Sequence, residues 1–225
     1  MLTEPQIDES LIALDRAVIE AVRARLAAGP WTGEDAAAIA LRPLLAGCGP
    51  AEAAAVKAVM GRLEAARTPL ATGGALAQVL AADRFGLAAR PSADAEAALK
   101  AADGGARAVL DLSGRPWWGR LLARPDLRVI ATLPDDPLSR PRAFVVARAT
   151  TGPTGDDRSF WVTDSGWSDA RIIEALSGAG LAAEALAASG GLKLFMLAGY
   201  VQAEDGRLDG APGSLSGVIG AAPLF

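Results

Sequence analysis

Hydrophobic positions recur at helical spacing over the first 70 residues of the chain. An apolar stripe in residues 8–28 predicts a helix, and extra apolar positions beside the stripe suggest that it packs against more than one neighbour. Two further helices are predicted over about 32–45, with Thr32 as the N-cap, and over about 51–67. The apolar positions of the first helix are Leu11, Ile12, Leu14, Val18, Ile19, Val22 and Leu26.

From about residue 72, helical stretches alternate with short apolar runs. Helices are predicted over 75–85 and 92–106, the second with Ser92 as its cap. The apolar runs are bounded by glycine and proline, as is typical of buried strands. This alternation favours a small α/β unit with a partly parallel sheet. The predicted strands cover residues 106–112, 127–134 and 142–149.

The final third follows a turn-rich segment, TTGPTGDD at 150–157, which suits a linker. It contains a strand, a helix and two more strands, followed by the segment GSLSGVIG at 213–220 and by APLF at 222–225. An order of strand, helix, strand, strand, helix and strand suggests a ferredoxin-like βαββαβ unit. The expected fold is therefore multidomain α and α/β, with a three-helix domain at 1–70, a small α/β domain at 71–150 and a ferredoxin-like domain at 151–225.

Composition narrows the possible chemistry. The chain has no histidine, which excludes a Ser-His-Asp triad, a Cys-His pair and a histidine-ligated zinc. Its single cysteine, Cys48, has no partner for an internal disulfide. The net charge is −4 and there is no sustained basic run, which argues against binding to nucleic acid or an anionic membrane surface. We expect no cofactor and no metal.

The N-terminal residues and the apolar segments predict neither a targeting signal nor a membrane span. The first ten residues, MLTEPQIDES, are acidic and lead into no continuous apolar stretch, unlike a secretory or transit signal. No window is apolar and long enough to suggest a membrane span. The expected location is the cytoplasm.

Two adjacent tryptophans, Trp117 and Trp118, lie between Arg115 and Arg120 in the segment RPWWGR. One interpretation is structural: the indoles cover the end of the strand at 106–112. The alternative is that they stack against an aromatic ligand as part of a binding site.

Residues 14–25, LDRAVIEAVRAR, resemble the first-helix signature of the all-helical chorismate mutases. The resemblance implies that Arg25 is a catalytic residue that holds a substrate carboxylate. Candidate substrate-binding cations are Arg42, Lys57 and Arg62, although no motif places them. The chain departs from the family at three positions where substrate-binding side chains are expected, and these hold Asp8, Ala36 and Ala71.

Residues 104–112, GGARAVLDL, and 128–148, RVIATLPDDPLSRPRAFVVAR, resemble two parts of a prephenate dehydratase. Arg142 matches a substrate-binding arginine of that family, but Pro141 precedes it where the family has a threonine. The family's Glu-Asn-Ser site is absent near Leu112. About one subdomain is also missing, so we expect no dehydratase cleft.

Residues 158–225 contain stretches that resemble the regulatory ACT domain that follows in bifunctional mutase–dehydratases. The family's phenylalanine-binding stretches are absent, and GWSDARI at 166–172 and EALAASG at 184–190 stand in their places. The chain thus resembles a shortened, divergent member of the chorismate mutase/prephenate dehydratase family.

These departures predict a catalytically degenerate protein of aromatic amino acid metabolism that is retained for binding. The expected ligand is a small anionic or aromatic metabolite of the chorismate, prephenate or phenylalanine class, or the partner is an enzyme whose activity it modulates. The family resemblance also implies a homodimer. Two alternatives remain: an active, divergent chorismate mutase that uses Arg25 and relocated cations, and a small-molecule-sensing module unrelated to these enzymes.

Overall fold

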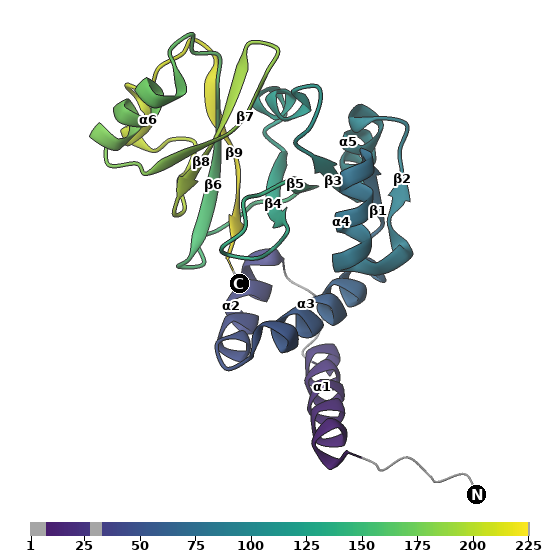
Figure 1. Ribbon diagram of the computed structural model, residues 1–225. Helices are drawn as coiled ribbons and strands as arrows, with labels where there is room; N and C mark the ends of the chain where they lie inside the picture. The colour runs from purple at the N-terminus through teal and green to yellow at the C-terminus, as the bar shows by residue number, and fades with distance from the viewer. Residues whose placement is uncertain (1–7, 28–32, 225) are drawn as a thin grey trace, which may run out of the picture.

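The computed structural model describes residues 8–27 and 33–224 and joins their strands into one mixed sheet (Figure 1). The predicted mixed α/β class is confirmed. The strands are β1 (Leu70–Gly73), β2 (Arg90–Pro91), β3 (Arg107–Asp111), β4 (Leu127–Leu133), β5 (Ala143–Arg148), β6 (Asp157–Thr163), β7 (Ala183–Ser189), β8 (Leu192–Ala198) and β9 (Ser216–Pro223). The helices are α1 (Glu9–Ala27), α2 (Glu34–Leu45), α3 (Pro50–Ala65), α4 (Ala75–Phe85), α5 (Ala95–Asp103) and α6 (Asp169–Gly178).

Half of the sheet has the order β2-β1-β3-β5-β4, in which β1 and β3 are parallel neighbours. Helix α4 connects β1 to β2, and helix α5 connects β2 to β3. The two helices cover opposite faces of the sheet. Successive residues of β3 alternate accordingly, so that Val109 packs in the cluster with α4 and Leu110 in the cluster with α5. The cap of α5 is Asp94, whose Oδ1 accepts a hydrogen bond from Ala97 N at 2.8 Å, and not the predicted Ser92.

The other half of the sheet has the order β9-β6-β8-β7, and all its neighbouring strands are antiparallel. This is the strand order of a split βαβ unit. Helix α6 covers one face, where Ile172 and Leu176 pack against Trp161 and Phe195. The expected second helix of a βαββαβ unit is reduced to a 3-10 turn, Gly206–Leu208.

The two halves share a hydrophobic core across a narrow seam between β4 and β9. These strands pair at a single position, Val129 with Gly220. Phe144 of the first half contacts Phe160 of the second, with ring centroids 4.3 Å apart, inside one continuous buried cluster. The division predicted at residue 150 therefore separates two strand topologies but does not separate two cores.

Gly220 makes the seam possible. Its φ is +144°, a conformation that favours glycine, and a Cβ there would collide with the backbone of Val129. Any side chain at this position would thus push β4 and β9 apart.

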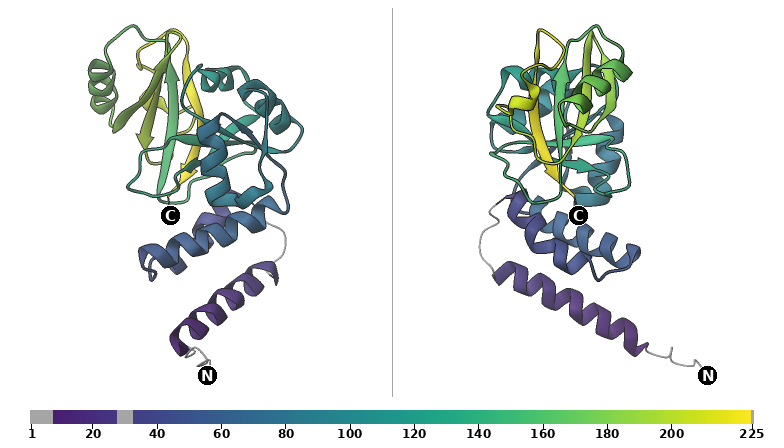
Figure 2. Two further views of the ribbon diagram at one scale, coloured as in Figure 1. Left: turned by 45° about the vertical axis from the view of Figure 1, so that its right-hand side comes forward. Right: turned by 90° about the vertical axis from the view of Figure 1, so that its left-hand side faces the viewer.

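Helices α2 and α3 lie against one end of the sheet and are attached by buried ion pairs (Figure 2). Arg107, at the start of β3, contacts Glu34 at 2.6 Å and Glu64 at 3.1 Å. Arg84 of α4 joins Glu64 at 3.8 Å and Asp135 at 2.8 Å. Burial and the nearby carboxylate of Glu34 raise the pKa of Glu64 to about 7, against the opposing effect of the two arginines.

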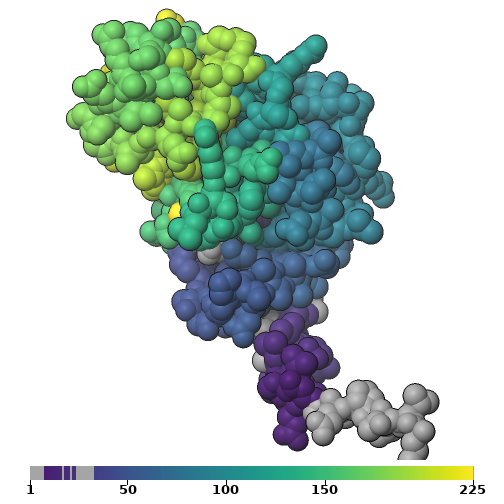
Figure 3. All heavy atoms as spheres, viewed as in Figure 1, coloured from purple at the N-terminus to yellow at the C-terminus, as the bar shows by residue number. Residues whose placement is uncertain are grey.

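Helix α1 projects from the rest of the protein (Figures 1 and 3). Val22 packs beside the small cluster of α2 and α3, but four large apolar side chains of α1 remain 43–58% exposed: Leu11, Ile12, Leu14 and Ile19. Among the described residues, this helix therefore lacks the predicted packing against several neighbours. Within residues 8–27 and 33–224, none of the helices has the length and apolar character needed to cross a bilayer.

Glu64 makes the stability of the protein depend on pH. Its carboxyl binds a proton more tightly in the folded chain, with a pKa of about 7, than at its ordinary value of 4.5. This contribution to the unfolding free energy is therefore fully present below pH 4.5 and is lost as pH rises through 7. Urea denaturation between pH 5 and pH 8 should show a smaller decrease for Glu64→Gln than for the unchanged protein. Equal slopes for the two proteins would contradict this assignment.

The seam between β4 and β9 should not tolerate a side chain at Gly220. We expect Gly220→Ala to lower the unfolding free energy by at least about 2 kcal/mol, because backbone strain adds to the collision with Val129. The matched control is Gly178→Ala, where the added Cβ meets nothing within 4 Å and a helix gains an alanine. Urea denaturation measures both, and equal stabilities for the two variants would contradict the close approach.

Candidate functional site

β1 and β3 are parallel neighbours, and a cleft lies just beyond their carboxyl ends. In open α/β sheets, ligands bind outside the carboxyl ends of parallel strands. The two strands end at Gly73 and Asp111, and the turn into α4 follows at once through Gly74. This places a glycine turn, two helix N-termini and a carboxylate together.

We call this cavity the strand-end cleft, and its volume is about 540 Å³. That size is within the range of small-molecule sites. The segment 113–120 and the start of α5 supply its walls. The cleft is lined by, among others, Gly74, Asp94, Glu96, Asp111, Ser113, Arg115, Pro116, Trp117 and Arg120.

Asp111 and Gly74 form the inner wall of the strand-end cleft. Asp111 is 6% exposed, and its Oδ1 accepts hydrogen bonds from Ser113 N at 3.2 Å and Ser113 Oγ at 2.6 Å. Gly74 has φ +108°, and a Cβ there would overlap the Asp111 carboxylate. The absence of a side chain at Gly74 therefore allows the carboxylate to lie directly against the β1–α4 turn.

Charged side chains of both signs surround the mouth of the strand-end cleft. Arg120 pairs with Glu96, and both are largely exposed. Arg115 is exposed and forms no salt bridge with any residue in the described part of the chain. Asp94 is engaged as the cap of α5. The arrangement provides hydrogen-bond donors and acceptors at fixed positions, but neither a histidine nor a cysteine for nucleophilic chemistry.

The two tryptophans close the end of the sheet from inside the protein. Trp118 is 1% exposed and Trp117 is 5% exposed, and both belong to the main buried cluster. Trp117 donates a hydrogen bond from Nε1 to Asp111 O at 2.7 Å, at the end of β3. This geometry agrees with the structural interpretation, while Trp118 has no face available to a ligand. Trp117 still borders the strand-end cleft.

Two of the proposed substrate-binding cations hold other parts of the chain. The guanidinium of Arg42 donates to Thr154 O at 2.7 Å, to Leu224 O at 3.0 Å and to Asp156 O at 3.1 Å. Lys57 donates to Asp135 O at 2.8 Å. These contacts fasten α2 and α3 to loops of the sheet.

The structure does not gather the remaining predicted site residues. Arg62 is exposed beside Gly86. Arg142 lies at the same sheet edge as Asp111, since its backbone bonds Leu133 and Leu112, but its side chain is exposed and does not line the strand-end cleft. Arg25 belongs to α1, but its side chain lies outside the described residues, so its predicted catalytic role stays a prediction.

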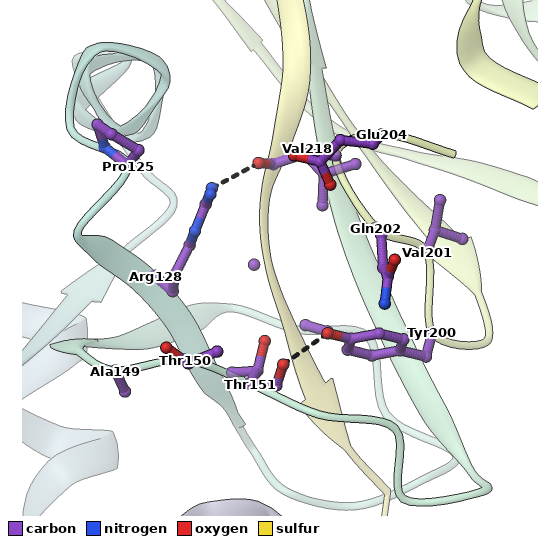
Figure 4. Close-up of a pocket in the computed structure, with 13 residues that line it drawn as sticks. Pro125, Arg128, Ala149, Thr150, Thr151, Tyr200, Val201, Gln202, Glu204 and Val218 are labelled. Atoms are coloured by element: carbon purple, nitrogen blue, oxygen red, sulfur yellow. Dashed lines mark hydrogen bonds between the residues drawn. The ribbon is translucent and has the colours of Figure 1, made fainter. Parts of the chain in front are cut away.

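A second cavity, of about 350 Å³, lies beside the seam between β4 and β9 (Figure 4). Arg128 extends across it and donates to Val218 O at 2.8 Å, and Tyr200 Oη donates to Thr151 O at 2.5 Å. The Arg128 contact thus joins β4 to β9 near their single paired position. The strand-end cleft is the stronger candidate, because its buried carboxylate is only partly used by the chain.

No cluster suited to a metal ion is found in the described residues, where no three carboxylate or cysteine side chains converge. The cleft carboxylates nearest to that role are separately engaged, Asp94 with the α5 backbone and Glu96 with Arg120.

Gly74, Asp111 and Ser113 are not among the site residues predicted from the sequence. A glycine pair at the end of one strand and an aspartate at the end of another are typical of strand-end sites. The pattern shows only when β1 is known to be a strand, and the sequence does not predict β1. Without β1, the sequence predicts no parallel neighbour for β3, and it does not reveal that Asp111 lies beside the end of another strand.

No family model matches the sequence, and no curated protein matches it. Among solved structures, the chain resembles one titled "GqqA- a novel type of quorum quenching acylases", at 17% identity and a TM-score of 0.47, over 69% of this chain and 95% of that one. It also resembles prephenate dehydratase from Streptococcus mutans, at 14% identity and a TM-score of 0.44, over 69% of this chain and 98% of that one. Both likenesses are weak, and neither assigns an activity.

Proposed function

We propose that this protein binds a small metabolite in the strand-end cleft and acts as a regulatory binding protein, without transforming the ligand. The observation that carries the proposal is the partly buried cavity at the carboxyl ends of β1 and β3, which contains the Asp111 carboxylate. The ligand class follows from the family resemblance of the sequence: a small carboxylate-bearing or aromatic metabolite of the prephenate or phenylalanine class.

The cleft chemistry supports binding in preference to catalysis. Arg115 provides positive charge at the mouth for a ligand carboxylate, and Pro116 and Trp117 provide an apolar edge for a ring. Two of the cations that a mutase site in the helices could use are engaged elsewhere, since Arg42 and Lys57 hold loops of the sheet.

The proposal includes a homodimer formed through α1. Four large apolar side chains on this projecting helix face solvent, and a second copy of the same helix would cover them: Leu11, Ile12, Leu14 and Ile19. The sequence resemblance to dimeric helical mutases agrees with this arrangement.

A bulky side chain in the strand-end cleft should abolish ligand binding. Thermal unfolding is followed with prephenate, phenylpyruvate and L-phenylalanine, because a ligand at a hundred times its Kd adds about 2.7 kcal/mol to the unfolding free energy. We expect at least one of these ligands to raise the Tm of the unchanged protein, and Ala93→Trp, which fills the cleft mouth, to remove the shift. Ala179→Trp, on an exposed residue after α6, is the control.

Two results would count against the regulatory proposal. The first is an equal Tm shift for Ala93→Trp and the unchanged protein, which would place the ligand elsewhere. The second comes from a separate absorbance assay: consumption of chorismate or prephenate by the purified protein would identify an enzyme.

Charges on the exposed face of α1 should separate the homodimer. Ile12→Glu combined with Ile19→Glu puts two carboxylates on one side of the helix, while glutamate preserves helix formation. Light scattering after gel filtration should give a dimer mass for the unchanged protein and a monomer mass for the variant. The control pair, Leu87→Glu with Leu138→Glu, changes exposed leucines elsewhere and should leave the dimer intact. A monomer mass for the unchanged protein would refute the arrangement.

A further inference from the structure

Asp111 has one carboxylate oxygen that the chain does not satisfy. Both hydrogen bonds from Ser113 go to Oδ1, and no residue in 8–27 or 33–224 donates a hydrogen bond to Oδ2. The side chain is 6% exposed, so water has little access to it. A buried carboxylate oxygen without a donor is costly, and such an oxygen in the wall of a cavity is suited to a donor on a ligand.

The chain also leaves the charge of Asp111 without a cationic partner. Arg120 is paired with Glu96, and Arg124 is paired with Asp103. Arg107, on the same strand, lies at the opposite end of β3 and contacts Glu34 and Glu64. Among the described residues, Asp111 forms no salt bridge. A cationic group on the ligand would therefore meet a carboxylate that no side chain of the protein neutralises.

We propose that Asp111 recognises an ammonium group, so that the strand-end cleft takes α-amino acids with an apolar side chain in preference to keto acids and hydroxy acids of the same skeleton. This inference rests on the proposed function and names the ligand class of the same cleft. The ammonium group donates to Asp111 Oδ2, and the ligand carboxylate lies towards Arg115 at the mouth of the cleft. The side chain of the amino acid contacts Pro116 and the edge of Trp117.

Gly74 sets how closely the ligand can approach. Because Gly74 has no side chain, the carboxylate of Asp111 rests against the turn between β1 and α4, with Oδ2 as the oxygen nearest to Gly74, and Asp111 lines the cavity at this point. Ser113 holds the other oxygen and so fixes the orientation of the carboxylate. Ser113 is in this sense a positioning residue.

A ligand series on the unchanged protein tests the inference without altering the fold. Isothermal titration calorimetry compares L-phenylalanine with phenylpyruvate, 3-phenyllactate and N-acetyl-L-phenylalanine, which share a benzyl group and a carboxylate but lack the ammonium group. We expect L-phenylalanine to bind at least tenfold more tightly than the other three, as the loss of a charge-assisted hydrogen bond predicts. Equal affinities for L-phenylalanine and phenylpyruvate would overturn the inference.

The variant Asp111→Asn separates ammonium recognition from a structural role. It retains the shape of the side chain and an acceptor for Ser113, but it removes the charge. We expect the affinity for L-phenylalanine to fall roughly tenfold to a hundredfold and that for phenylpyruvate to stay constant or rise. The matched control is Glu96→Gln, which removes a carboxylate from the same cleft that Arg120 already pairs. A uniform loss of affinity for both ligands in Asp111→Asn would overturn the inference.

The two proposals fail in different ways. If none of the four ligands binds the unchanged protein, the proposed function for the strand-end cleft fails, and the inference about Asp111 fails with it. If the keto acid binds as well as the amino acid and Ala93→Trp blocks both, the cleft is a binding site but the preference for an ammonium group is wrong.

Discussion

The parallel pairing of β1 with β3 determines where the charged groups of this protein meet. β3 is five residues long and is buried for most of its length, yet it carries a charged side chain at each end. Arg107 begins the strand among the glutamates of α2 and α3, and Asp111 ends it in the wall of the strand-end cleft. Five residues of strand span only about 13 Å, so one extended segment sets the distance between the attachment of the helices and the cleft.

Buried charge is distributed unevenly between these two ends. At the Arg107 end, each charged side chain meets partners of opposite sign, and the cluster orients α2 and α3 relative to the sheet. Such pairs contribute specificity more than stability, because much of their attraction offsets the cost of leaving water. At the Asp111 end, the carboxylate has hydrogen bonds on one oxygen only. Among the described residues, arginines therefore pair with the buried carboxylates at one end of β3 but not with the Asp111 carboxylate at the other end.

The sequence predicts the strands whose apolar runs are clearly bounded by turn residues, but it misses β1 and leaves β9 unassigned. The runs that became β3, β4 and β5 are bounded by glycine or proline and lie where they were expected. β1 has four residues, begins directly after Pro69 and ends at the first glycine of a pair, and it is too short for any periodicity to show. Residue types also do not reveal partners. Arg42 carries the charge of a ligand-binding residue, but its role as a contact for distant carbonyl groups depends on chain segments more than a hundred residues away.

That contact of Arg42 has a consequence for the order in which the protein assembles. It joins α2 to Leu224, a sequence separation of 182 residues, so the partners of this arginine are complete only after nearly all of the sequence shown has been synthesised. Contacts of such high order are slow to form, because a long loop must close first. During translation, α2 can therefore make this contact only after β9 has been synthesised.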